Sequence, residues 1–149
     1  MPKALILWSS RTGNTTVIGN LIAEGLRMAG CETEIRDVKY VESESEVAGF
    51  DAWVLGSSTF HGEMNQPMKA FLFMAEKSEL ENVVGGAFGA FEWSNEASDR
   101  IFNTMKYVFK MKMVAGPLRL KSATRKDGIK IAHEYGKEIA ALIARQRIS

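Results

Sequence analysis

Residues 3–30, KALILWSSRTGNTTVIGNLIAEGLRMAG, contain the signals that decide the fold. The run Lys3–Trp8 is short and almost entirely apolar, which is typical of a strand buried on both faces of a sheet. From Asn14 to Met28 the apolar residues recur at helical spacing, and Gly30 follows as a helix C-cap. The stretch therefore predicts a buried strand that leads directly into an amphipathic helix.

The same alternation of strand and helix signals continues to the end of the chain. Further strands are predicted at Thr33–Val38, Ala52–Leu55, Val83–Phe88 and within Met111–Leu120, where Gly116-Pro117 is an interruption. Further helices are predicted from Pro67 to about Lys77, from Ser94 or Asn95 to about Phe109, and from Thr124 or Asp127 onward. The helix that ends near Phe109 is expected to carry Ala97, Ile101, Met105 and Val108 on one face, and the apolar face of the last helix is expected to carry Ile131, Tyr135, Ile139 and Leu142. Five strands alternating with helices predict an α/β fold, a three-layer sandwich around a five-stranded parallel sheet.

Length and composition agree with one soluble globular domain over residues 1–149. The chain is 46% hydrophobic and 25% charged, which excludes disorder as a description of the whole. No run of 18 apolar residues suggests a membrane span, and we see no signal peptide. Cys31 is the single cysteine, which excludes an intramolecular disulfide. We therefore expect a cytoplasmic protein.

The net charge of +1 hides an uneven distribution along the chain. Residues 1–99 contain 7 Lys and Arg against 15 Asp and Glu, whereas residues 100–149 contain 12 against 3. Such asymmetry can mark a surface for a charged partner. Sequence halves need not be spatial halves, however, so we favour mixing of the two charge sets in the fold.

Three unusual segments follow the first, third and fourth predicted strands, at the edge where ligands bind in an open parallel sheet. The first, Ser9–Thr16, places hydroxyls, Arg11 and Gly13 before a helix N-terminus, which favours a phosphate group. It contains neither a Walker A motif nor a dinucleotide fingerprint, and the alternative is a hydroxyl-rich helix cap. The second, Ser57–Met64, and the third, Gly89–Asn95, contain aromatic residues that suit stacking on a flat ring. Their alternatives are a plain surface loop and ordinary core packing.

Other chemistries fit these segments poorly. A phospho-acceptor domain needs acidic residues at the ends of strands one and three, where this chain has serine. A serine hydrolase of this class needs a G-x-S-x-G elbow, which is absent. A metal site would rest on His61 and His133 alone, and we expect His133 on an exposed helix face.

With these three segments in view, the sequence resembles the flavodoxins. Ser9–Thr15 is similar to the flavodoxin phosphate loop, [ST]-x-T-G-N-T, and Gly86–Ser94 resembles the flavodoxin-like domain of flavodiiron proteins. The resemblance implies strand order 2-1-3-4-5 and FMN as the cofactor. The FMN phosphate would lie on Ser9, Ser10, Arg11, Thr12, Gly13, Asn14 and Thr15. One side of the isoalloxazine ring would lie against Ser58, Thr59, Phe60, His61 and Gly62, and the other against Ala90, Phe91, Glu92 and Trp93.

The resemblance implies a monomeric electron carrier that docks redox proteins at an exposed flavin edge and binds neither nucleic acid nor membranes. In flavodoxins a backbone carbonyl near the second loop's glycine accepts a hydrogen bond from the reduced ring, a role that we assign to the His61–Gly62 peptide or a neighbouring one. A mildly acidic flavin face is expected, from Glu63, Glu92, Glu96 and Asp99. The alternatives are a small FMN oxidoreductase, such as an NAD(P)H:quinone reductase or a protoporphyrinogen-oxidase-like enzyme, and a flavodoxin fold used without flavin.

Overall fold

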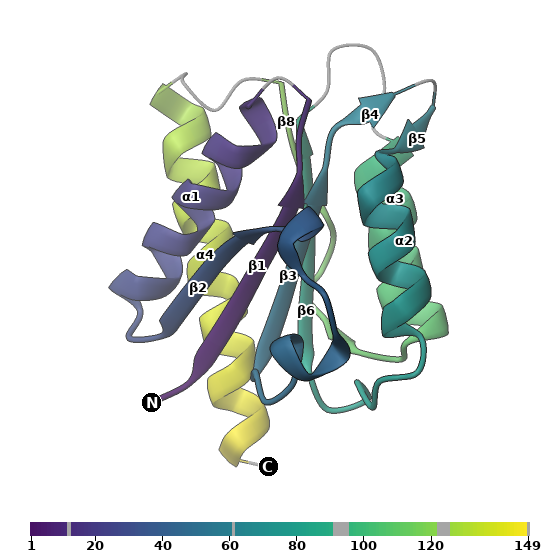
Figure 1. Ribbon diagram of the computed structural model, residues 1–149. Helices are drawn as coiled ribbons and strands as arrows, with labels where there is room; N and C mark the ends of the chain where they lie inside the picture. Colours follow the sequence, from purple (N-terminus) through teal and green to yellow (C-terminus); the bar gives the residue numbers. More distant parts are fainter. Residues whose placement is uncertain (12, 61, 91–95, 122–125, 149) are drawn as a thin grey trace.

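A parallel sheet in the order β2-β1-β3-β6-β7 forms the middle layer of the protein (Figure 1). We describe a computed structural model of residues 1–11, 13–60, 62–90, 96–121 and 126–148. The strands are β1 (Lys3–Ser9), β2 (Glu32–Asp37), β3 (Ala52–Ser57), β4 (Thr59–Phe60), β5 (Glu63–Met64), β6 (Val84–Ala90), β7 (Lys112–Met113) and β8 (Leu118–Leu120). The helices are α1 (Asn14–Met28), α2 (Gln66–Ala75), α3 (Glu96–Asn103) and α4 (Lys126–Ile148). Shorter turns are the 3₁₀ segments Val38–Tyr40 and Glu44–Val47 and the π-helical segment Thr104–Val108.

The predicted strand order is confirmed, with the fifth strand divided in two. β7 pairs with the beginning of β6 and β8 with its end, both in parallel. The chain between them contains Gly116-Pro117, and proline cannot donate a ladder hydrogen bond. The edge of the sheet is therefore broken at the interruption that the sequence predicts.

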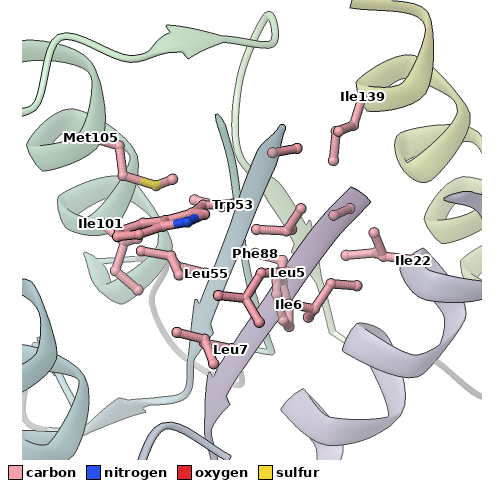
Figure 2. Close-up of a cluster of buried hydrophobic side chains, with 14 of the residues drawn as sticks. Leu5, Ile6, Leu7, Ile22, Trp53, Leu55, Phe88, Ile101, Met105 and Ile139 are labelled. Carbon is pink, nitrogen blue, oxygen red and sulfur yellow. The ribbon is translucent and has the colours of Figure 1, made fainter. Parts of the chain in front are cut away.

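Helices α1 and α4 cover one face of the sheet, and α2 and α3 cover the other (Figure 1). Figure 2 shows the resulting double core, with Trp53 and Ile101 on the side of α3 and Ile22 and Ile139 on the side of α1 and α4. Because both faces are covered, every residue of β3 and β6 is buried. This explains why the central strands are continuous apolar runs and do not alternate.

Helix α1 ends as the sequence predicts. Gly30 lies one residue beyond the C-cap and has a φ of +89°, a left-handed conformation that favours glycine. The Gly30 N–H donates to the Arg27 carbonyl and the Cys31 N–H donates to the Leu26 carbonyl, each at 3.0 Å. These two bonds form a Schellman motif, which satisfies carbonyl groups that the end of a helix would otherwise leave unpaired.

Two glycines bring α1 and α4 into direct backbone contact. A Cβ atom at Gly25 would lie 2.3 Å from the His133 carbonyl oxygen, and one at Gly136 would lie 2.3 Å from the Ile22 carbonyl oxygen. The expectation that His133 lies on an exposed face is therefore wrong: its side chain is 21% exposed, and its Nε2 lies 2.7 Å from Glu24 Oε2. The spacing of apolar residues in α4 cannot show which of its polar residues, such as His133, are covered by α1.

The predicted apolar faces of two helices need smaller corrections. Tyr135 and Ile139 are buried in α4 as expected, but Ile131 is 45% exposed. In the α3 region the helix continues into the π-helical turn, where Val108 is 55% exposed although Met105 is fully buried. Extra residues in a π turn rotate the following side chains away from the face that 3.6-residue spacing predicts. Among the described residues, no helix combines the length and the apolar character that crossing a membrane requires.

A buried tyrosine makes the fold sensitive to alkaline pH. The Tyr135 hydroxyl donates to the Gly116 carbonyl at 2.8 Å and accepts from the Ala87 N–H at 3.1 Å, and its burial raises the pKa well above the usual value. Above pH about 10, unfolded chains therefore release this proton while the folded protein retains it, so stability falls. The free energy of unfolding is to be measured with urea between about pH 8 and pH 11. We expect it to fall more steeply with rising pH in wild type than in Tyr135→Phe. Equal slopes would contradict this.

Candidate functional site

The first two predicted site segments begin side by side at the carboxyl edge of the sheet. Ser9 at the end of β1 is in register with Ser57 at the end of β3, and the Ser58 N–H donates to the Ser9 carbonyl at 3.2 Å. The end of β6 lies at the same edge, together with the β4–β5 hairpin (Figure 1). The fold thus brings the first two segments and the beginning of the third to one edge, as the topology of a parallel sheet requires.

The loop after β1 prepares the N-terminus of α1 to receive an anion. Gly13 is the N-cap, with a φ of +90°, and its N–H donates to Ser10 Oγ at 2.8 Å. Within the described residues, no side-chain cap hydrogen bond forms at this helix end, and the first turn contains no acidic residue. The N–H groups and the positive dipole end of this turn therefore suit a phosphate group.

Thr15 gives a separate indication of a ligand at this helix end. Its side chain is fully buried, yet its Oγ1 has no hydrogen-bond partner among the described residues. A buried polar group without a partner costs free energy, and native proteins rarely retain one without a reason. A phosphate oxygen at the helix N-terminus would accept a hydrogen bond from this hydroxyl. The residues present therefore fit a phosphorylated cofactor better than a structural cap.

The second segment forms a hairpin, which the sequence analysis missed. Thr59 pairs with Met64 and Phe60 with Glu63, and Gly62, which lies between the two strands in sequence, has a φ of +73°. Two strands of two residues are too short to show alternation in the sequence. The other end of the hairpin is held against α3, because Thr59 Oγ1 accepts a hydrogen bond from the Ala97 N–H at 3.1 Å.

The third segment is only partly described. Ala90 ends β6 and is buried, whereas Phe91, Glu92 and Trp93 lie outside the described residues, as do Thr12 and His61 of the other two segments. Gly89 permits the close approach of β6 to β3, since a Cβ atom there would lie 2.9 Å from the Ser57 carbonyl oxygen.

Asn65 is a buried site residue that the sequence analysis missed. Its Nδ2 donates to the Ser9 carbonyl at 3.1 Å and to Ser58 Oγ at 3.0 Å. Its backbone N–H donates to Ser57 Oγ at 2.9 Å. Asn65 thus contacts the ends of both β1 and β3, across 56 residues of sequence. No sequence pattern links residues so far apart.

The charges beside the hairpin are paired. Glu63 lies 2.5 Å from Lys69 Nζ and 2.9 Å from Arg100 Nη1, and these two cations, Lys69 foremost, hold the pKa of its carboxyl below the usual value. Asp99 accepts from Arg119 Nε at 2.9 Å and Nη2 at 2.6 Å. The expected acidic flavin face is therefore wrong as regards Glu63 and Asp99. The expected mixing of the two charge sets is right, because cations from residue 100 onward pair with acids of the first 99 residues.

His133 belongs to no metal site within the described part of the chain. His133 pairs with Glu24 on the far side of the sheet from the hairpin, and His61 lies outside the described residues. Within the described ranges, no group of three or more His, Cys, Asp or Glu side chains gathers closely enough to hold a metal ion.

Comparison with known proteins places these features in a family. An archaeal flavodoxin of known structure superposes with a TM-score of 0.89 and 26% identity, over 95% of this chain and 99% of that one. The flavo-diiron protein FprA2 of Clostridium acetobutylicum is 26% identical over 143 residues, which are 93% of this chain and 36% of that protein. An NAD(P)H dehydrogenase (quinone) of Archaeoglobus fulgidus is 29% identical over 120 residues, 64% of this chain and 63% of that protein.

The relatives differ in length, but the family is clear. The chain spans between 18% and 36% of the flavoproteins that match it first, all of which are much longer proteins. The family model of the flavodoxin domain matches residues 5–115, which include all three site segments. Flavodoxins carry FMN at the switch point between the first and third strands. The chain therefore belongs to the flavodoxin family, and its cofactor is FMN.

Proposed function

We propose that this protein is a flavodoxin-type carrier, which binds FMN across the carboxyl ends of β1, β3 and β6 and passes single electrons between redox proteins. The observation that carries the proposal is the buried, unpartnered hydroxyl of Thr15 in the uncapped first turn of α1. The flavin supplies the electron chemistry when bound, and the protein supplies binding, orientation and electrostatics.

The phosphate end of the cofactor would be held by the loop from Ser9 to Thr15. Gly13 lets the chain turn so that the first N–H groups of α1 face outward, and Ser10 fixes that turn through its bond to the Gly13 N–H. Arg11 is exposed in the same loop and adds a positive charge toward a phosphate dianion. Thr15 adds a neutral donor from within the helix.

The ring end would lie between the β4–β5 hairpin and the segment after Ala90. The Ser58 hydroxyl already accepts from Asn65 and the Thr59 hydroxyl from Ala97, so each keeps its own proton to donate. We assign the contact with the ring's nitrogen edge to the His61–Gly62 peptide, because the positive φ of Gly62 favours a residue without a Cβ at this turn.

A second candidate is a quinone reductase, because the Archaeoglobus relative aligns over 63% of its length. The carrier is the better supported of the two, since 95% of this chain superposes on 99% of a flavodoxin. Small carriers dock their partners through transient interfaces. Because Glu63 and Asp99 are each paired with an arginine, these two carboxylates do not make the surface beside the hairpin strongly acidic.

The two functions differ in what the purified protein does alone. We expect the protein to bind one equivalent of FMN and to oxidise NADH or NADPH with a quinone no faster than the same concentration of free FMN. The first measurement is a fluorescence titration of the cofactor-free protein with FMN. The second is an absorbance assay at about 340 nm, which follows the oxidation of the nicotinamide and gives the turnover rate. Rapid turnover would establish the reductase, whereas failure to bind FMN would indicate a fold used without flavin.

A further inference from the structure

We propose that Asn65 is the positioning residue that couples the phosphate loop, Ser9–Thr15, to the ring loop, Ser58–Gly62, so that the two ends of FMN are held at a fixed separation. The inference rests on the proposed binding of FMN across this edge. It concerns a residue that contacts both loops and lies in neither of them. Asn65 belongs to the turn between β5 and α2.

The contacts of Asn65 use every N–H group that the residue possesses. The two side-chain donors reach the Ser9 carbonyl and Ser58 Oγ, and the backbone donor reaches Ser57 Oγ. Ser57 Oγ in turn donates to the Ser58 carbonyl at 2.9 Å. The residue is 8% exposed, so water does not compete freely for these bonds. A displacement of either loop would break at least one of them.

Asn65 lies at the N-terminus of α2, yet its side-chain amide hydrogen-bonds the two loops and does not cap the helix. Asn65 is the N-cap of α2, a place where asparagine is common because its side-chain oxygen accepts an N–H of the first turn. Here no side-chain cap bond forms, and the Met68 and Lys69 N–H groups donate to the backbone carbonyl of Asn65. Serine or aspartate would cap α2 at least as well. Only an amide of this length places two donors between the Ser9 carbonyl and Ser58.

Helix α2 gives this coupling a rigid support. Lys69, one turn further along α2, pairs with Glu63 of the hairpin, so the helix holds the ring loop at two points. The first point is a carboxylate on β5 and the second is the Ser58 hydroxyl beside β4. Among the described residues, the hydrogen bond from Asn65 Nδ2 to the Ser9 carbonyl joins the start of the phosphate loop to the same support.

The test compares Asn65→Asp with Gln66→Glu. Asn65→Asp keeps size and capping ability but removes both side-chain donors, and the new carboxylate would face the Ser9 carbonyl oxygen. Gln66→Glu adds the same charge one residue further along, at an exposed position outside the network. We expect Asn65→Asp to raise the Kd for FMN about tenfold. Gln66→Glu should leave it within about twofold.

Two further readouts separate positioning from general stability. The separation of the two one-electron potentials of the FMN-bound protein should change in Asn65→Asp and not in Gln66→Glu. Hydrogen exchange of the Ser58 amide, which donates to the Ser9 carbonyl, should quicken in Asn65→Asp without FMN. Asn65→Ser is the uncharged second variant, with a preferred N-cap residue too short to bridge the loops, and it should change all three quantities in the same direction.

The outcomes distinguish this inference from the proposed function. If both Asn65 variants match Gln66→Glu in Kd, potentials and Ser58 exchange, the coupling role is overturned. If wild type itself does not bind FMN, the proposed function is overturned, whereas the Ser58 exchange rates still decide whether Asn65 fixes one loop to the other.

Discussion

Replacing Thr15 with valine should weaken FMN binding about 10- to 100-fold, the cost of one hydrogen bond to a charged group. The same change should stabilise the cofactor-free protein by about 1 kcal/mol, because a methyl group replaces a buried hydroxyl without a partner. Threonine and valine have similar shape and helix propensity, so neither effect comes from the backbone. The opposite signs would identify a residue whose partner is the ligand.

The measurements for Thr15→Val are an FMN titration of the cofactor-free protein and urea unfolding without FMN. Thr16→Val is the matched control, since Thr16 is the next residue of the same turn but is only half-buried. It should leave both quantities close to wild type. A Thr15→Val protein that binds FMN as tightly as wild type would show that the phosphate does not contact this hydroxyl.

Gly136→Ala should lower the free energy of unfolding by about 2–3 kcal/mol. Alanine in a helix gains about 1 kcal/mol of propensity over glycine, which alone would stabilise α4. The new Cβ would however lie 2.3 Å from the Ile22 carbonyl oxygen and 2.8 Å from the Leu26 nitrogen, atoms of a backbone that no side-chain rotation can move. The two helices must separate, which loosens the packing along the whole crossing, so the steric cost exceeds the gain in propensity.

Gly116→Ala is the control for this change. Nothing lies within 4 Å of a Cβ atom at Gly116. The Tyr135 hydroxyl donates to the backbone carbonyl of Gly116, a group that alanine would retain. We expect its urea midpoint to stay near that of wild type. If Gly136→Ala were as stable as Gly116→Ala, α1 and α4 could not be in backbone contact at this point.

The sequence alone predicts the elements of this fold well, because periodicity reports local burial. The run Ala4–Trp8 is apolar since both faces of β1 are covered there, and Gly30 marks a helix end since its left-handed backbone conformation closes the Schellman motif. The phosphate segment could be predicted for a similar reason. Its hydroxyls, Gly13 and the following helix are contiguous in the chain.

What the sequence could not predict depends on pairs of residues distant in the chain. Asn65 reaches Ser9 across 56 residues, and Arg119 reaches Asp99 between two different elements. A helix wheel places Ile131 with Tyr135, but the position of α4 over β6 and α1 decides which of them is covered. Such contacts follow from the tertiary arrangement, and the propensities of single residues contain no information about it.

The two open edges of the sheet have a consequence for the protein's behaviour at high concentration. Strands at an edge can recruit another chain through their unpaired backbone groups. On one side β2 carries Glu32, Glu34, Arg36 and Asp37, whose charges would have to be desolvated on contact with a second sheet. On the other side the edge is divided into two short strands, β7 with two residues and β8 with three. Both borders therefore resist sheet-to-sheet aggregation.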